Sequence, residues 1–280
     1  MSSPSPALLA AIRSQDVAQV SALLEEGPPS PDLVAAATSA KAHAVLALLI
    51  ERGAPVDASA GEVGPLHKVA DAKAVQALVA AGADVNRPGP AGLTPLHMAA
   101  SNADPPVIKA LLAAGADPQA LDGRGQVPLQ VAAELGRTAA VKALLARPPA
   151  DPLPWHLLAS FSQRSGKKEQ ATLAALLAVL PPDAPPMPGF GYALHIAARA
   201  GIAASVQALL AAGADKNRLD FEGFTAAHRA IEAALGGFDP RPGQVAAYQA
   251  LVEAGADVDI VCGGTTARAL ALKLPPARKK

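Results

Sequence analysis

Apolar residues recur along the chain in short stretches that end in a leucine pair, or in Leu-Val, and are followed by glycine. The tripeptide Gly-Ala-Asp closes four of these stretches, and it begins at Gly82, Gly115, Gly213 and Gly255. Apolar positions three to four residues apart favour an amphipathic helix, and a glycine in the left-handed conformation can end one. The pattern therefore predicts a series of short α-helices that end at glycines.

A second motif precedes these stretches and is fullest at Thr94-Pro-Leu-His97. Related tetrads begin at Gly64, Val127, Leu153, Tyr192 and Thr225. A threonine before a helix can accept an unpaired backbone N–H, and proline at the first helical position has no N–H to leave unpaired. Each tetrad therefore predicts the start of a first helix, and the leucine pair that follows belongs to a second helix.

These motifs, in this order, resemble the ankyrin repeat. The segments from Gly92 to Ala100 and from Val107 to Asp117 together nearly spell the consensus of that family. The resemblance implies an all-α ankyrin-repeat solenoid, in which helix-turn-helix units stack and β-turn fingers project. One such unit cannot bury its apolar face alone, so its stability comes from stacking against neighbours and requires capped ends.

The repeats lead us to expect a single solenoid over residues 1–280. It would consist of a cap-like repeat at 1–31, ankyrin repeats at 32–260, and a C-terminal cap with a basic tail at 261–280. Unit boundaries fall near 5–31, 32–58, 59–87, 88–120, 121–152, 153–188, 189–218 and 219–260. Irregular spacing predicts insertions near 162–169 and 236–243, a first helix shortened to about 66–71, and a stiff proline-rich segment at 181–188.

Composition fits close, repetitive packing and excludes several classes of partner. Hydrophobic residues make up 51% of the chain and aromatic residues 3%, and 68 residues are alanine. Because 24 basic residues balance 24 acidic ones, we expect no binding to nucleic acid or to an anionic membrane. We also find no apolar run near the roughly 18–20 residues of a membrane span, and no signal peptide.

The single cysteine, Cys262, excludes an intramolecular disulfide framework and fits a reducing compartment. We therefore expect a cytoplasmic protein that is monomeric by itself. Its alanine-, glycine- and proline-rich composition suits a bacterial gene of high GC content.

Five of the six histidines occupy the last position of a tetrad, and they are His67, His97, His156, His195 and His228. Helices pack about 8–10 Å apart, whereas the ligands of one zinc ion each lie about 2 Å from it. Histidines of successive repeats therefore cannot share a metal, and the resemblance implies that they hydrogen-bond neighbouring backbone instead. The chain also lacks a nucleophile elbow and a phosphate loop, so we expect no catalytic residues, no metal and no cofactor.

Exposed side chains at fingers and inner helices are the candidate partner-binding residues. The resemblance places Phe221, Glu222 and Phe224 on a projecting finger and Tyr192 beside the preceding one. The residues that follow the Ala-Ala pairs of the inner helices should face the concave surface, and among them are Glu134, Leu135, Arg199 and Glu232. Because aromatic residues and arginine dominate interface hot spots, we expect a protein partner on the concave side of the C-terminal half. Trp155 replaces the buried leucine of its tetrad and is interpreted as core.

The sequence thus favours a non-enzymatic protein-protein interaction module that binds and inhibits or regulates one partner. An immunity protein that inhibits a toxin is one concrete form of this hypothesis. The alternative is a scaffold or adaptor, or a host-directed bacterial ankyrin effector. The residues leave these alternatives open.

Overall fold

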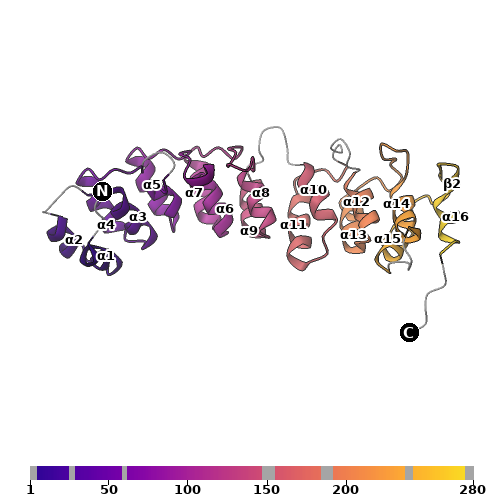
Figure 1. Cartoon of the computed structure of the whole chain (residues 1–280), viewed down its shortest axis with the longest axis horizontal. Helices are drawn as coiled ribbons and strands as arrows, with labels where there is room; N and C mark the ends of the chain where they lie inside the picture. The colour runs from indigo at the N-terminus through magenta and orange to yellow at the C-terminus, as the bar shows by residue number, and fades with distance from the viewer. Residues whose placement is uncertain are drawn as a thin grey trace. The chain divides into compact units, whose positions relative to one another are not determined.

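The computed structural model describes residues 5–24, 29–58, 62–146, 155–183, 192–236 and 242–274. Across these residues the chain is mostly helical, and its helices follow one another in antiparallel pairs (Figure 1). The chain divides into two compact units, Met1–Pro149 and Ala150–Lys280.

The first unit contains five helix pairs in its described residues, and each pair packs against the next. The elements are α1 (Pro6–Arg13), α2 (Val17–Leu23), α3 (Pro31–Ser39), α4 (His43–Glu51), η2 (Pro65–Lys68), α5 (Ala72–Ala80), η3 (Pro90–Gly92), α6 (Pro95–Asn102), α7 (Pro105–Ala113), α8 (Pro128–Glu134) and α9 (Thr138–Leu145). The first helix of each pair is called the inner helix and the second the outer helix. Inner helix α6 contacts inner helix α8, and outer helix α7 contacts both α5 and α9.

The second unit repeats this arrangement and ends in a small hairpin. Its elements are α10 (Trp155–Ser162), α11 (Lys167–Leu177), α12 (Ala193–Ala200), α13 (Ala203–Ala211), α14 (Ala226–Leu235), α15 (Pro242–Glu253), β1 (Val261–Cys262), β2 (Thr265–Thr266) and α16 (Ala267–Ala271). Strands β1 and β2 pair antiparallel, with Val261 opposite Thr266 and Cys262 opposite Thr265. Helix α16 packs against α14 after the hairpin.

The core follows from the two sequence patterns. The leucine of the outer helices is fully buried, with 0% exposure at Leu78, Leu111 and Leu209. The alanine pairs of the inner helices are buried as well, and their small side chains allow neighbouring inner helices to approach closely. The glycines of the Gly-Ala-Asp motifs have positive φ values, such as +93° at Gly115, which confirms their predicted role at helix ends.

The tetrad histidines connect each repeat to the next. Nδ1 of His97 accepts the Thr94 backbone N–H at 3.2 Å, so its Nε2 carries the proton and donates to the Gln126 carbonyl oxygen at 2.9 Å. The imidazole Nε2 of three further histidines pairs with the carbonyl oxygen of a following residue: His67 with Leu93, His195 with Arg218 and Phe224, and His228 with Thr265. This confirms the structural role predicted for the histidines, except for His156, whose side chain lies outside the described residues.

We expect His97→Ala to lower the free energy of unfolding by about 1–3 kcal/mol, because it leaves buried backbone groups without a partner. Urea denaturation measures this change. His97→Gln is the matched control, since Gln130 naturally occupies the equivalent position and its Oε1 accepts the Val127 N–H at 2.8 Å. The glutamine variant should retain most of the stability. An alanine variant as stable as the wild type would contradict this role.

Acid should destabilise the fold through two of these histidines. Burial lowers the pKa of His67 and of His195 below the ordinary histidine value. Below about pH 6.5 the unfolded chain therefore binds protons that the folded chain does not, and stability falls as pH falls. We expect a lower urea midpoint at pH 5.5 than at pH 7.5, and a smaller difference in the His67→Gln, His195→Gln double variant. An identical pH dependence in wild type and double variant would contradict this assignment.

The first helix predicted at 66–71 is shorter in the structure. It is the 3-10 helix η2, Pro65–Lys68, and Val69 already has an extended backbone with ψ of 136°. The carboxylate of Asp71 accepts the Ala74 N–H at 2.9 Å and so begins α5 instead of ending the first helix. The predicted role of Trp155 in the core and most of the proline-rich segment at 181–188 lie outside the described residues.

Candidate functional site

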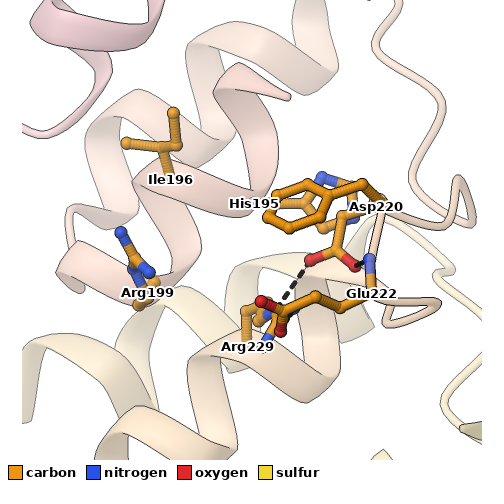
Figure 2. A pocket seen from close by; sticks show the side chains of 7 residues that line it. His195, Ile196, Arg199, Asp220, Glu222 and Arg229 are labelled. Atoms are coloured by element: carbon orange, nitrogen blue, oxygen red, sulfur yellow. Dashed lines mark hydrogen bonds and ion pairs between the residues drawn. The ribbon is translucent and has the colours of Figure 1, made fainter. Parts of the chain in front are cut away.

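A hollow in the second unit lies where helix α12, the finger at 219–225 and helix α14 meet (Figure 2). Three kinds of side chain line it: imidazole and aliphatic groups of α12, polar and aromatic groups of the finger, and arginines of α12 and α14. The lining residues are His195, Ile196, Arg199, Asp220, Phe221, Glu222 and Arg229. We refer to it as the α12–α14 hollow.

Asp220 builds the finger on one side of this hollow. Its Oδ1 accepts the N–H groups of Glu222 and Phe224, both at 3.0 Å, and its own N–H donates to the Phe224 carbonyl at 2.9 Å. Gly223 has a φ of +80°, the conformation that the tight turn of this finger requires. This turn places Phe221 and Glu222 at the tip, where the Phe221 side chain is 61% exposed.

Arg229 ties the finger to helix α14. Its guanidinium pairs with Asp220 Oδ2 at 2.6 Å through Nε, with Glu222 through Nη2, and with Glu232 Oε2 at 3.5 Å through Nη1. The same guanidinium lies over the Phe224 ring, 4.6 Å from its centroid. Three carboxylates surround one guanidinium, so these four side chains carry a formal net charge of −2.

The network keeps its central groups charged. Burial alone would raise the pKa of Asp220, but hydrogen bonds from Arg229 and from the Phe224 N–H bring that pKa below its ordinary value. Burial alone would lower the pKa of Arg229, whereas Asp220 and Glu222 raise it above the ordinary arginine value. Because both groups stay ionised at neutral pH, the finger is held by charge-assisted hydrogen bonds.

The predicted partner-binding residues fall into two places. In the second unit, Arg199 and Phe221 line the α12–α14 hollow, together with Glu222, while Glu232 pairs with Arg229 beside it. The guanidinium of Arg199 is exposed on the α12 side, apart from Asp220 and Glu222, and it has no ion pair among the described residues (Figure 2).

Tyr192 and Phe224, which are predicted as exposed, are each half-buried beneath an arginine. The Arg218 guanidinium lies 4.8 Å from the centroid of the Tyr192 ring. Phe224 lies between Arg229 and the His228 ring, whose centroid is 6.0 Å away. Both aromatic side chains therefore contribute to packing within the unit, and their contact with a partner stays a prediction.

Glu134 and Leu135 belong to the first unit, in a separate hollow between α6, α8 and the finger at 121–126. Oε1 of Glu134 accepts a hydrogen bond from the Gln126 side chain at 2.8 Å, and Leu135 is 51% exposed. The apolar side chains of Leu93, Met98 and Val131 also line this hollow. The structure thus provides a second surface with a more apolar character.

Four residues of the α12–α14 hollow are not predicted from the sequence as site residues, and they are His195, Ile196, Asp220 and Arg229. The sequence predicts a structural role for His195 and a tight turn for Asp220-Phe-Glu-Gly223, and it indicates no role for Ile196 or Arg229. The spacing of Arg229 three residues before Glu232 on a predicted helix is a signal for an ion pair that could have indicated it.

Three titratable groups of the hollow, His195, Asp220 and Arg229, form hydrogen bonds or ion pairs within the unit itself. His195 is 3% exposed and its Nε2 lies 3.0 Å from two backbone carbonyl oxygens, while Asp220 and Arg229 bind each other. Over the described residues there is no cluster of three or more His, Cys, Asp or Glu side chains placed to hold a metal ion. No described helix is long and apolar enough to cross a membrane.

Comparison with known protein families identifies the repeats. A family model described as ankyrin repeats, in three copies, matches residues 66–153, and a model of a single ankyrin repeat matches residues 192–221. No curated protein matches the chain. With the helix pairs described above, these matches define the fold as an all-α ankyrin-repeat solenoid. Ankyrin repeats indicate a protein-protein interaction module.

Proposed function

We propose that the protein binds one partner protein through the α12–α14 hollow and the adjoining finger, and that it thereby inhibits or regulates that partner. The observation that carries the proposal is Phe221, which is 61% exposed at the rim of a charged hollow. An exposed aromatic ring gains free energy when a partner covers it, and such residues dominate interface hot spots.

The geometry of the finger supports binding over catalysis. Asp220 is fixed by two backbone N–H groups and by Arg229, and the His195 imidazole is fixed by backbone carbonyls. These groups hold the shape of the surface, and a surface that is organised before binding loses less conformational entropy when the partner docks. We therefore propose a non-enzymatic role, in the cytoplasm, for a chain that is monomeric until it meets its partner.

An immunity protein that blocks a toxin is the form of inhibitor that we propose first. The hollow in the first unit favours a second candidate, a scaffold or an exported effector that holds two partners. Its apolar lining and the exposed Leu135 give it a chemistry unlike that of the charged hollow in the second unit. The two candidates differ in the number of proteins bound at once.

The test is a pull-down from the native lysate with the wild-type chain, Phe221→Ala and Leu121→Ala. Leu121 is the matched control, because it is 63% exposed on a finger of the first unit. We expect one stoichiometric protein that is retained by the wild type and by Leu121→Ala but lost with Phe221→Ala. Loss with Leu121→Ala alone would place the interface in the first unit, and two proteins bound together would favour the scaffold.

A further inference from the structure

We propose that the α12–α14 hollow recognises an arginine side chain of its protein partner; this inference rests on the proposed function. The first observation is the excess of negative charge beside the finger. Glu222 and Glu232 are 52% and 40% exposed at the side chain, and both bind the single guanidinium of Arg229. These carboxylates and that of Asp220 leave a net charge of −2 after Arg229 is counted, and one partner cation would neutralise half of it.

The carboxylates also have unused acceptor capacity. Glu222 and Glu232 each contact Arg229 through Oε2, and no hydrogen bond to either Oε1 occurs within the described part of the chain. A carboxylate accepts several hydrogen bonds, and a guanidinium presents a planar fork of N–H donors. The exposed oxygens can therefore receive the fork of an incoming arginine while Arg229 keeps its own contacts.

Phe221 supplies the apolar part of the same site. It directly precedes Glu222 at the finger tip and is 61% exposed. Three other aromatic rings of this unit lie beneath an arginine, with guanidinium-to-centroid distances of 5.0 Å at Phe161, 4.8 Å at Tyr192 and 4.6 Å at Phe224. Among the described residues, Phe221 has no such cation. A partner arginine would complete the arrangement that the fold already uses, since guanidinium groups are attracted to aromatic faces.

Arginine fits this site better than lysine for two reasons. Its planar group can stack on Phe221 and meet the Glu222 carboxylate at the same time, whereas the ammonium of lysine is a compact and strongly hydrated charge. Arg199 sets the orientation, because its exposed guanidinium repels a second cation on the α12 side of the hollow. The partner arginine is therefore directed to the side of the hollow formed by the finger and α14.

The experiment is a selection from a random peptide display library on the full-length chain, followed by affinity measurements. We expect selected peptides to share an arginine. Exchanging that arginine for citrulline, its neutral isostere, should weaken binding about 10-fold or more, as the loss of a charge-assisted hydrogen bond does. Glu222→Gln combined with Glu232→Gln should weaken the arginine peptide by a similar factor and leave the citrulline peptide unchanged. Glu253→Gln, an exposed carboxylate on α15, is the control for net charge.

The outcomes separate this inference from the function on which it rests. Peptides that depend on Phe221 but contain no arginine, or that tolerate citrulline, would overturn the arginine site and leave the binding surface intact. The absence of any selected peptide whose binding falls with Phe221→Ala would overturn both. Melting temperatures equal to that of the wild type show that each variant is folded.

Discussion

Replacing Leu111 by alanine should lower the free energy of unfolding by about 2–5 kcal/mol, the largest effect that we expect from a single substitution. Leu111 lies in the last turn of α7 and is 0% exposed. Outer helices α5 and α9 pack on either side of α7, so the shortened side chain leaves a cavity that neighbouring repeats cannot fill without moving.

Urea denaturation followed by circular dichroism measures this change. Leu121→Ala is the matched control, because the same atoms are removed from a side chain that is 63% exposed. The control should change stability by less than about 0.5 kcal/mol. If both variants unfold at the wild-type midpoint, the stacked core described here does not determine the stability of the first unit.

Arg229→Ala should destabilise the second unit by about 3 kcal/mol, because it leaves the carboxylate of Asp220 without its counter-ion. The Asp220 side chain is only 3% exposed, and that of Arg229 is 16% exposed. The expected loss is at the lower end for a broken buried pair, since Asp220 keeps hydrogen bonds from two backbone N–H groups. Adding Asp220→Asn to Arg229→Ala removes the stranded charge and should recover part of the stability.

Arg268→Ala is the matched control for this prediction. Arg268 forms an ion pair as well, a bidentate one with Asp259, but both side chains are more than half exposed, and such pairs contribute little. The difference between the wild type and Arg229→Ala should shrink at acid pH. The pKa of Asp220 is lowered in the folded state, so the stabilisation is present above about pH 3.9 and is lost as pH falls below it. Equal destabilisation by both substitutions would contradict a special role for Arg229.

The repeated local signals predicted the fold well. Among the described tetrads, the first residue is followed at once by a helix, as Thr94 is by α6 and Thr225 by α14. Proline or alanine can begin the helix, and at Thr94 the His97 imidazole accepts the backbone N–H that precedes it. The exception is the tetrad at Gly64, where Asp71 competes as the cap of the next helix and leaves only the 3-10 helix η2. Such competition between two neighbouring caps is decided by packing and cannot be judged from residue types.

The candidate site was predicted less completely, because its contacts join residues that are distant in sequence. Arg218 covers Tyr192 from 26 positions away, and Arg229 reaches back to Asp220 across the finger. The sequence indicated that Phe221 lies on a projecting finger, and its exposure agrees with this. It does not indicate that arginines cover the rings of Tyr192 and Phe224, which it predicts as exposed.

The most direct test of the proposed interface is the affinity of the purified partner for the wild-type chain and for Phe221→Ala, measured by titration calorimetry. Because the ring is 61% exposed, its removal should leave the melting temperature unchanged. A central aromatic anchor contributes about 2 kcal/mol or more, so the dissociation constant should rise about 30-fold. An unchanged dissociation constant in a variant with the wild-type melting temperature would contradict the proposal that the protein binds through the α12–α14 hollow.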